Sequence, residues 1–432
     1  MKNKIFVFEF VSGGGFSKEE IPTSLLCEGF SMLRSIIEDF KSLDFTVNTL
    51  LDHRISFLSH LVEAENMESI GKNHNFIEKF KDGVKNAEFC FIIAPEFSNI
   101  LKKLTKIANE YDKKILSVGI NGIELCSSKF NTFQFFKSQS LSTPKTNLIP
   151  NTNGYPNKKK VQQLIKKVKF PAILKPDDGV GAESIFYFDT QEQLFDFLDN
   201  IQNHLESNRK YVLQEYVSGR DLSIILLNNK NLVDSEKQPL LLSVNSQKIQ
   251  IEGSEGNSQY FGGLVPIENY KDMEKKVNFL LQGVDFRDFS GIFGIDFVYD
   301  NKTVDFIEIN PRLTTSYIGL RYALQNNPIE LLMQSTMGSL SSDKPKISHH
   351  SIFKRVELNY SGTATPKEVR SKISPTISER FSTEFITPPF SLHKGSRHYS
   401  CFIATKEKRK RASVQKIEEI YSVLRDHEFL IC

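Results

Sequence analysis

The chain has 432 residues, of which 39% are hydrophobic and 25% charged, and its formal net charge is +3. This composition suits a folded globular protein of two to four domains and excludes a disordered or strongly basic nucleic-acid-binding chain. Its five cysteines are scattered without metal-site or disulfide spacing, which favours reduced thiols in a cytoplasmic protein, and no apolar run reaches the roughly 18 residues of a membrane span.

The first part of the chain alternates predicted strands with predicted helices. Strands are predicted at residues 4–10, 45–51, 88–94 and 114–119, and helices at 24–41 and 97–111. This alternation is typical of a parallel α/β sheet. We therefore expect a Rossmann-like domain over residues 1–120.

The second part is predicted to be smaller and mixed. A helix is predicted at residues 129–138, strands at 171–176, 184–188 and 211–216, and a helix that starts near Thr190 and extends to about residue 205. Beyond these elements the pattern becomes rich in strands, at 222–227, 240–244, 294–299 and 304–309, before a helix at 328–337. The glycine-rich stretch 252–263 is predicted to be a long loop. Residues 345–432 carry no motif, although a strand at 398–405 and a helix at 412–425 are expected.

The strongest sign of a functional site is the motif DFIEINPR at residues 305–312. Because side chains two apart in a strand share a face, Glu308 and Asn310 are predicted to point one way, and Ile307 and Ile309 into the core. Asp296 stands in an apolar strand upstream, at a distance that allows the two strands to form a hairpin. Two carboxylates and an amide on one sheet face would suit Mg²⁺, although each carboxylate could instead face solvent.

Two further motifs could bind a nucleotide. Lys175 closes an apolar strand just before a glycine turn at 179–181, an arrangement that can surround phosphates with an ammonium and backbone N–H groups. The sequence QEYVSGRD at 214–221 could offer a strand edge to adenine, and Asp221 could accept hydrogen bonds from a ribose. Taken alone, a lysine at a strand end is commonly just exposed.

In their order and spacing these motifs resemble the ATP-grasp superfamily. The series runs from Lys129 through Lys175, QEYVSGRD and Asp296 to IEINPR, and it covers about residues 120–340. The resemblance implies an α/β fold in which the Rossmann-like domain precedes a two-part ATP-grasp fold. The lid subdomain would span residues 121–215, the subdomain with the metal site 216–344, and a small C-terminal extension 345–432.

The resemblance also implies a role for each matching residue. Lys129 and Lys175 would hold the ATP phosphates beneath a flap that contains Gly179 and Gly181. Adenine and ribose would be bound by Gln214, Glu215, Val217 and Asp221, and Mg²⁺, for which Mn²⁺ could substitute, by Asp296, Glu308 and Asn310. Lys175 and Arg312 would be the catalytic residues. Many relatives have an arginine at the position of Gly294, so Arg312 or Arg287 would have to compensate.

Two segments look like one branch, the tyramine–glutamate ligase family of methanofuran biosynthesis. They are FVFEFVSGGG near the start of the chain and NPRLTTSY at 310–317. The resemblance implies that a small-molecule carboxylate, such as the γ-carboxylate of glutamate, is activated as an acyl phosphate and joined to an amine such as tyramine. Homodimerisation is expected by analogy only. The glycines at 13–15 would form a turn near the substrate or an ordinary tight turn.

Several alternatives remain open at this point. The chain could be an ATP-grasp ligase for another acid and amine, a carboxylate–thiol ligase, a phosphotransferase, or a nucleotide-binding regulator without catalysis. The basic run KEKRKR at 406–411 could bind nucleic acid, or be a solvated surface. The absence of G-x-S-x-G and Walker A motifs argues against hydrolase and P-loop functions.

Overall fold

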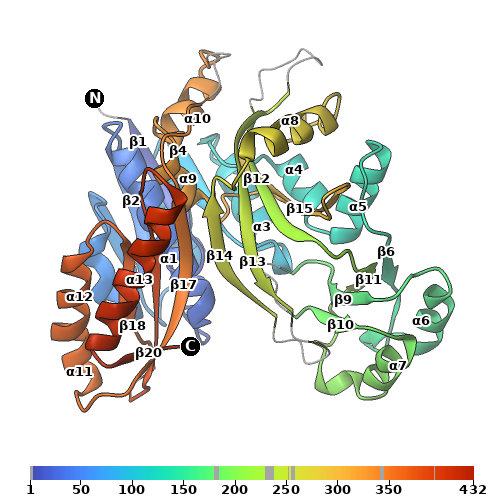
Figure 1. The fold of residues 1–432 in the computed structure, drawn as a ribbon. Helices are drawn as coiled ribbons and strands as arrows, with labels where there is room; N and C mark the ends of the chain where they lie inside the picture. Colours follow the sequence, from blue (N-terminus) through green and yellow to red (C-terminus); the bar gives the residue numbers. More distant parts are fainter. Residues whose placement is uncertain are drawn as a thin grey trace.

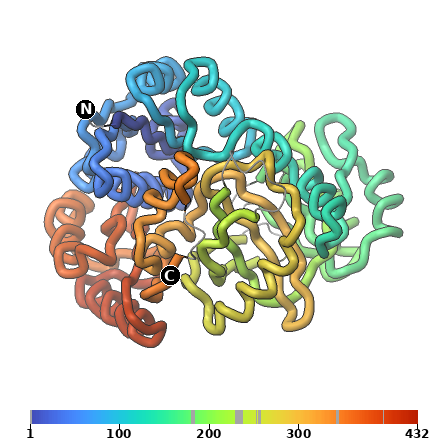
Figure 2. Tube along the Cα trace, turned by 90° about the horizontal axis from the view of Figure 1, so that it is seen from above, coloured from blue at the N-terminus to red at the C-terminus, as the bar shows by residue number. Residues whose placement is uncertain are grey.

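A computed structural model describes residues 3–179, 184–228, 238–251, 253, 258–340, 345–393 and 395–432. Gly181 and most of the segment 252–257 lie outside the described residues. Seen from above, the N-terminal lobe, the C-terminal lobe and a lobe of residues around 145–215 surround a central sheet (Figure 2). Among the described residues, no helix has the length and apolar character needed to cross a membrane.

The N-terminal lobe is built on a parallel sheet with strand order β3-β2-β1-β4-β5. Its strands are β1 (Lys4–Glu9), β2 (Thr46–Asp52), β3 (Asn66–Ile70), β4 (Phe89–Ile93) and β5 (Lys114–Ile115), and its helices are α1 (Thr23–Lys41), α2 (Phe76–Lys85) and α3 (Ile100–Glu110). The predicted Rossmann-like architecture is confirmed. Strand β3 and helix α2 were not predicted, because β3 is a mostly exposed edge strand and α2 buries only Phe80 and Val84.

A second, antiparallel sheet with order β10-β9-β11-β6 forms the lobe on the right of Figure 1. Its strands are β6 (Thr146–Ile149), β9 (Ala172–Pro176), β10 (Phe186–Phe188) and β11 (Tyr211–Glu215); the short β7 (Asn151–Thr152) and β8 (Tyr155–Pro156) pair separately. Helices α6 (Lys158–Ile165) and α7 (Gln191–Asp199) pack on this sheet around a core of their own. Helix α7 is capped by Thr190, whose hydroxyl accepts a hydrogen bond from the Gln193 N–H, but it ends earlier than predicted.

The central sheet has nine strands in the part of the chain that the structure describes. Its order is β16-β15-β12-β13-β14-β17-β19-β18, and β20 also pairs with β17. The strands are β12 (Arg220–Asn228), β13 (Leu240–Gln250), β14 (Gln259–Val265), β15 (Gly291–Tyr299), β16 (Val304–Asn310), β17 (Ser351–Tyr360), β18 (Phe385–Phe390), β19 (His398–Ala404) and β20 (Phe429–Ile431). Because β17 pairs with β14, the C-terminal residues continue the sheet (Figure 1).

Strand β14 corrects the prediction of a loop over the whole of 252–263. Gly262 has a φ of +101°, and a Cβ there would lie 2.0 Å from the Phe353 carbonyl oxygen. A Cβ on Gly263 would lie 1.8 Å from the carbonyl oxygen of Ser246. These glycines therefore allow close backbone approach inside a sheet, a role that a glycine count does not distinguish from loop flexibility.

The remaining helices support the central sheet and the C-terminal lobe. They are α4 (Ile120–Cys126), α5 (Lys129–Ser138), α8 (Tyr270–Leu280), α9 (Tyr317–Ala323), α10 (Pro328–Thr336), α11 (Pro366–Glu368), α12 (Ser374–Arg380) and α13 (Lys410–Asp426). The predicted helix 129–138 is confirmed at both ends, and its N-cap, Ser128, accepts a hydrogen bond from the Asn131 N–H. All five cysteines are free, and four of them are buried.

Candidate active site

The hairpin of β15 and β16 places two carboxylates side by side. Asp296 and Glu308 are direct cross-strand partners, as the hairpin prediction required. The register then shifts, so that Phe297 pairs with Phe306 and Ile307 has no partner opposite it. At this bulge the side chain of Ile307 lies in the wall of a cavity. The prediction that Ile307 points into the core is therefore wrong, because a bulge breaks the strict alternation of faces.

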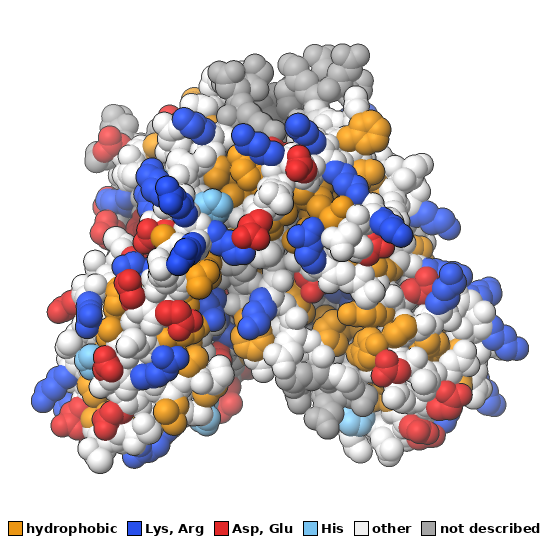
Figure 3. Space-filling model, viewed as in Figure 1, with side chains coloured by type: hydrophobic (Ala, Val, Ile, Leu, Met, Phe, Trp, Pro, Cys, Tyr) orange, Lys and Arg blue, Asp and Glu red, His pale blue; other side chains and the backbone are white. Residues whose placement is uncertain are grey.

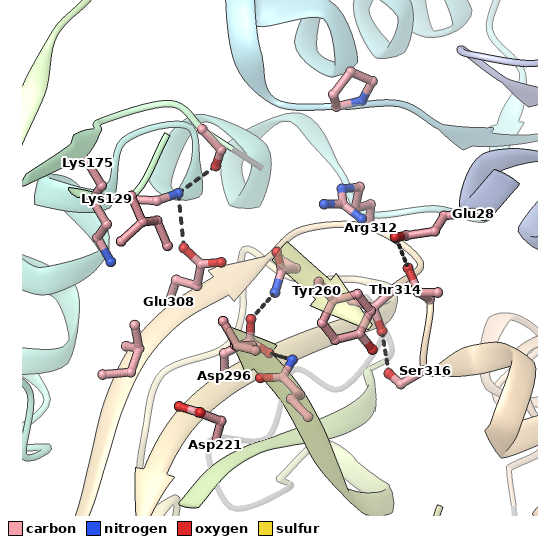
Figure 4. Close-up of a pocket in the computed structure, with 18 of the residues that line it drawn as sticks. Glu28, Lys129, Lys175, Asp221, Tyr260, Asp296, Glu308, Arg312, Thr314 and Ser316 are labelled. Carbon is pink, nitrogen blue, oxygen red and sulfur yellow. Dashed lines mark hydrogen bonds and ion pairs between the residues drawn. The ribbon is translucent and has the colours of Figure 1, made fainter. Parts of the chain in front are cut away.

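Burial and the proximity of Glu308 raise the pKa of Asp296 to about 7. Asp296 accepts hydrogen bonds from Gln247 Nε2 at 2.9 Å and from Asn310 Nδ2 at 3.0 Å (Figure 4). Burial would also raise the pKa of Glu308, but Lys129 and Lys175 outweigh that effect and lower it. The site therefore holds two crowded carboxylates whose repulsion a divalent cation would relieve.

The oxygen donors of Asp296, Glu308 and Asn310 fit the preference of Mg²⁺. No group of three or more His, Cys, Asp or Glu side chains within the described ranges could hold a metal by itself. Two carboxylates are nevertheless a common protein contribution where Mg²⁺ takes its remaining ligands from water and substrate phosphates. The donor set thus fits a cation shared with a nucleotide rather than a closed protein cage.

Two lysines face these carboxylates, one buried (Lys175) and one partly buried (Lys129). Lys129 Nζ lies 3.0 Å from Glu308 Oε2 and donates to the Gly179 carbonyl oxygen at 2.5 Å (Figure 4). Burial alone would lower the pKa of Lys129, but Glu308 and its other acidic neighbours raise it above the usual value. Lys175, only 4% exposed, has a pKa lowered to about 8 by burial, with Lys129 contributing. Lys175 is therefore not the exposed strand-end lysine of the alternative interpretation.

Asp177 fixes the two lysine-bearing segments to each other. Its carboxylate accepts hydrogen bonds from the Phe130 N–H at 3.0 Å and from the Ser128 hydroxyl at 2.9 Å. Its carbonyl oxygen accepts from the Lys129 N–H at 2.8 Å. Asp177 thus holds the start of α5 against the end of β9. The sequence analysis did not single it out, although it lies only two residues after the strand-end lysine.

The predicted nucleotide-binding residues Gln214, Glu215, Val217 and Asp221 all line the cavity. Gln214 Nε2 donates to Thr146 Oγ1 at 2.7 Å, and the Glu215 carboxylate accepts from the Lys169 N–H at 3.0 Å. Both side chains are engaged within the protein. The prediction of an open strand edge is wrong for β11, because this strand lies between β9 and β6 and the Glu215 N–H bonds to the Lys145 carbonyl oxygen. Burial raises the pKa of Asp221, whose side chain is drawn at the same cavity (Figure 4).

Arg312 crosses from the end of β16 towards the N-terminal lobe. Its Nε lies 3.1 Å and 3.2 Å from the carboxylate oxygens of Glu96, which follows β4. A Cβ on Gly294 would lie 2.7 Å from Thr314 Cγ2, so Thr314 fills the space that a side chain at this position would need. Arg287, by contrast, is 78% exposed, is paired with Asp285 and lies outside the cavity wall. The suggestion that Arg287 compensates for the arginine missing at position 294 is therefore wrong. Arg312, which lines the cavity, remains the candidate for that role.

The cavity measures about 220 Å³ and extends from the lysines to the surface of the N-terminal lobe. It lies between the lobes, where the face shown in Figure 3 is hollowed. Its outer wall contains residues that the sequence analysis missed, chiefly Glu28 and Leu25 on α1 and Tyr260 on β14. The only sequence sign of this wall was Glu9, a lone carboxylate in an apolar strand. The glycines 13–15 do not line it; they pack on Phe8, Phe10 and Ile70 as a tight turn.

The basic run 406–411 is partly engaged within the protein. Lys410 pairs with Glu268 at 2.8 Å, and the Lys406 ammonium lies 5.9 Å from the centre of the Tyr322 ring. These contacts match the alternative of a solvated protein surface better than a continuous basic stripe for nucleic acid.

Comparison with known proteins agrees with this geometry. The model of the ATP-grasp domain matches residues 126–316, and that of the pre ATP-grasp 3 domain matches residues 45–121. A tyramine–L-glutamate ligase of Methanocaldococcus jannaschii is 29% identical over 338 residues, which are 77% of this chain and 88% of that relative.

Solved structures share the fold. An L-amino acid ligase from Bacillus licheniformis superposes with a TM-score of 0.64 at 14% identity, covering 100% of this chain and 98% of that one. The biotin carboxylase domain of 2-oxoglutarate carboxylase from Hydrogenobacter thermophilus, solved with MgADP and bicarbonate, gives a TM-score of 0.65 at 14% identity, with 100% and 91% coverage.

The chain therefore belongs to the ATP-grasp superfamily.

Proposed function

We propose that this protein uses ATP and Mg²⁺ to activate a small-molecule carboxylate as an acyl phosphate and to join it to an amine. The observation that carries the proposal is the pairing of Asp296 with Glu308 across the hairpin, directly opposite Lys129 and Lys175. Such a set of cations and metal-binding carboxylates meets the need of phosphoryl transfer, in which charge builds on phosphate oxygens.

Each residue of the inner cavity has a part in this proposal. Lys129 and Lys175 bind the phosphates of ATP, while the segment from Gln214 to Asp221 holds the nucleoside. Asp296, Glu308 and Asn310 hold the cation, which neutralises phosphate charge when bound. Mn²⁺ offers similar coordination chemistry and could replace Mg²⁺.

The reaction then needs two displacements. A carboxylate oxygen of the acid attacks the γ-phosphorus, and ADP leaves. The amine nitrogen attacks the acyl carbon, phosphate leaves, and the nitrogen loses a proton. Arg312 lies beside the carboxylates at the centre of the cavity, where its guanidinium can orient the acid or its phosphorylated form. Walls from separate lobes exclude water, which would hydrolyse the intermediate.

For the substrates we propose the γ-carboxylate of glutamate and an amine such as tyramine as the first pair to test. The support is the Methanocaldococcus jannaschii relative, whose name states tyramine and L-glutamate, together with a second relative of the same name from Methanocaldococcus fervens that is 29% identical over 322 residues.

The test is to incubate the purified protein with Mg-ATP, L-glutamate and a panel of amines that includes tyramine. We expect ADP, phosphate and an amide by mass spectrometry, with the amide dependent on both the acid and the amine. Glu308→Gln should reduce product formation by about 10²-fold to 10³-fold, whereas Asp305→Asn, on the same strand but outside the cavity, should not. A thioester formed from a panel of thiols would contradict the proposal and indicate a carboxylate–thiol ligase. A stable phosphorylated product that accumulates would indicate a phosphotransferase.

A further inference from the structure

The outer end of the cavity differs in charge from its inner end. Lys129 and Lys175 stand at one side of the close-up and Glu28 at the other, with Arg312 between them (Figure 4). Glu28 lies on α1, the first helix of the chain, far in sequence from every predicted site residue. The cavity thus joins a cationic end to a carboxylate end.

Glu28 has partners, but they leave it turned towards the cavity. Its side chain is 16% exposed, and it accepts a hydrogen bond from Thr315 Oγ1 at 3.0 Å. Arg355, on β17, lies 3.6 Å from the other carboxylate oxygen and is shared with Glu357 at 3.0 Å. The second arginine that faces Glu28, Arg312, is paired with Glu96. The carboxylates here therefore outnumber the guanidinium groups, and a further cation would balance the charge.

The second carboxylate at this end of the cavity is that of Glu9, and it is hydrogen-bonded to the residues that follow it in the chain. Its oxygens accept hydrogen bonds from the N–H groups of Val11 at 3.0 Å and Ser12 at 2.7 Å, and from the Ser12 hydroxyl at 2.6 Å. Helix α1 passes directly over it, since a Cβ on Gly29 would lie 2.7 Å from this carboxyl group. Glu9 therefore adds negative charge beneath the helix, while Glu28 is the carboxylate positioned to contact a ligand.

The walls around Glu28 are largely apolar. Leu25 and Met32 on α1, Val11 after β1, Pro95 after β4 and Ile249 on β13 all line the cavity at this end or beside it. Tyr260 adds an aromatic ring, shown between Asp296 and the Thr314 to Ser316 segment (Figure 4). One carboxylate within apolar surface is complementary to a cation on a hydrocarbon body.

We propose that Glu28 binds the ammonium group of the second substrate, a primary amine with an apolar aliphatic or aromatic body, and that α1 forms the wall of this amine subsite. The inference rests on the proposed function and assigns a residue and a substrate class to it. The ammonium gives one proton to the Glu28 carboxylate, and the neutral nitrogen then attacks the acyl carbon as the C–O bond to phosphate breaks. The nitrogen loses its second proton to the departing phosphate, which leaves the amide.

Four charged or titratable groups that face Glu28 influence its charge state. They are Arg355 and Glu357 on β17, Arg312 after β16 and Tyr260 on β14. Burial raises the pKa of Glu28, and the two arginines oppose that effect without cancelling it. A carboxylate in this setting accepts a proton more readily than an exposed glutamate does.

The test separates binding of the amine from activation of the acid. Hydroxylamine is small and uncharged at neutral pH, and it traps acyl phosphates as hydroxamates without needing an ammonium-binding carboxylate. With Glu28→Gln, we expect kcat/KM for the amine to fall about 10-fold to 100-fold, as for loss of a charge-assisted hydrogen bond. Hydroxamate formation from the acid, ATP and hydroxylamine should remain within about twofold of wild type. Glu20→Gln, exposed and outside the cavity wall, is the matched control.

A second variant tests the wall independently of charge. Leu25→Ala should lower kcat/KM for an arylalkyl amine several-fold and leave that for methylamine unchanged, because methylamine has no body to pack on α1. If Glu28→Gln forms amide as efficiently as wild type, or loses hydroxamate and amide formation in parallel, the amine assignment is overturned. If wild type forms no hydroxamate with any acid, the proposed function itself fails.

Discussion

The inner and outer ends of the cavity are built in different ways. At the inner end, Asp296 and Glu308 are cross-strand neighbours, and Lys129 and Lys175 are brought to them by α5 and β9, which Asp177 links. At the outer end, Glu28 comes from α1 and depends on Arg355, 327 residues further along the chain. The residues proposed to bind phosphate are thus held together by strand pairing and by the contacts of Asp177. The outer wall, by contrast, is formed by the N-terminal lobe, the central sheet and the C-terminal lobe together.

The largest effect is expected at the inner end. Glu308→Gln should reduce turnover by about 10²-fold to 10³-fold, because it removes a metal-binding charge and leaves Lys129 without its partner. ADP release measures the effect, and thermal unfolding checks that the fold is kept. The matched variant Asp305→Asn retains an acceptor for the Ser142 hydroxyl and should stay active. Wild-type activity in Glu308→Gln would refute the metal assignment.

At the outer end, the position of α1 should depend on one buried ion pair. Asp39 accepts hydrogen bonds from Arg321 at 2.8 Å and from the Tyr317 hydroxyl at 2.6 Å, and so ties α1 to α9. Asp39→Asn should lower the free energy of unfolding by about 3 kcal/mol, as expected when one partner of a buried pair is removed. Urea denaturation measures it. The half-exposed neighbour gives the control: Glu38→Gln should cost less than about 1 kcal/mol.

The pH dependence of ATP binding should report Lys175. Since burial lowers its pKa to about 8, its ammonium is present below that pH and is lost as the pH rises. The dissociation constant for ATP should therefore rise about tenfold between pH 7 and pH 9. Calorimetry at fixed Mg²⁺ measures it, and Lys175→Arg, which stays charged, should remove the dependence. An unchanged slope in that variant would assign the titration to another group.

The smallest effect tests the contact between the two ends of the chain. Arg355→Lys keeps the charge beside Glu28 but loses the fork that also holds Glu357, so KM for the amine should rise about threefold. KM values for ATP and the acid should not change. Arg397→Lys in the same lobe, where the arginine donates to carbonyl oxygens of Tyr360 and Gly362, is the control. A rise in KM for ATP instead would show that Arg355 acts on the inner end.

The carboxylate pair of the inner end was predictable because it is local in sequence: alternation within a strand and the length of one hairpin were enough to pair Asp296 with Glu308. The two lysines are distant in sequence, and their part in the site was expected only from the family resemblance. The bulge at Ile307 was not predictable, since a one-residue shift in register leaves no mark in composition.

The outer end was missed for a physical reason. Glu28 sits in a helix whose apolar stripe fully accounts for its sequence, so a carboxylate there has the pattern of an ordinary solvent-facing residue. Only the packing of Arg355 and Thr315 against it reveals otherwise. In the same way, the glycines of β14 indicated a loop because their tertiary neighbours, β13 and β17, were unknown.

The pairing of β14 with β17 fixes the distance between the two ends of the cavity. Glu308 on β16 and Arg355 on β17 belong to one hydrogen-bonded sheet, so the span between the phosphoryl-transfer centre and the carboxylate that Arg355 supports is set by strand spacing. The N-terminal lobe, which carries Glu28 on α1, and the lobe of β6, β9, β10 and β11 stand on sheets of their own. The distance from the bound ammonium to the acyl phosphate would therefore be set by the protein and not by the length of the amine's hydrocarbon body.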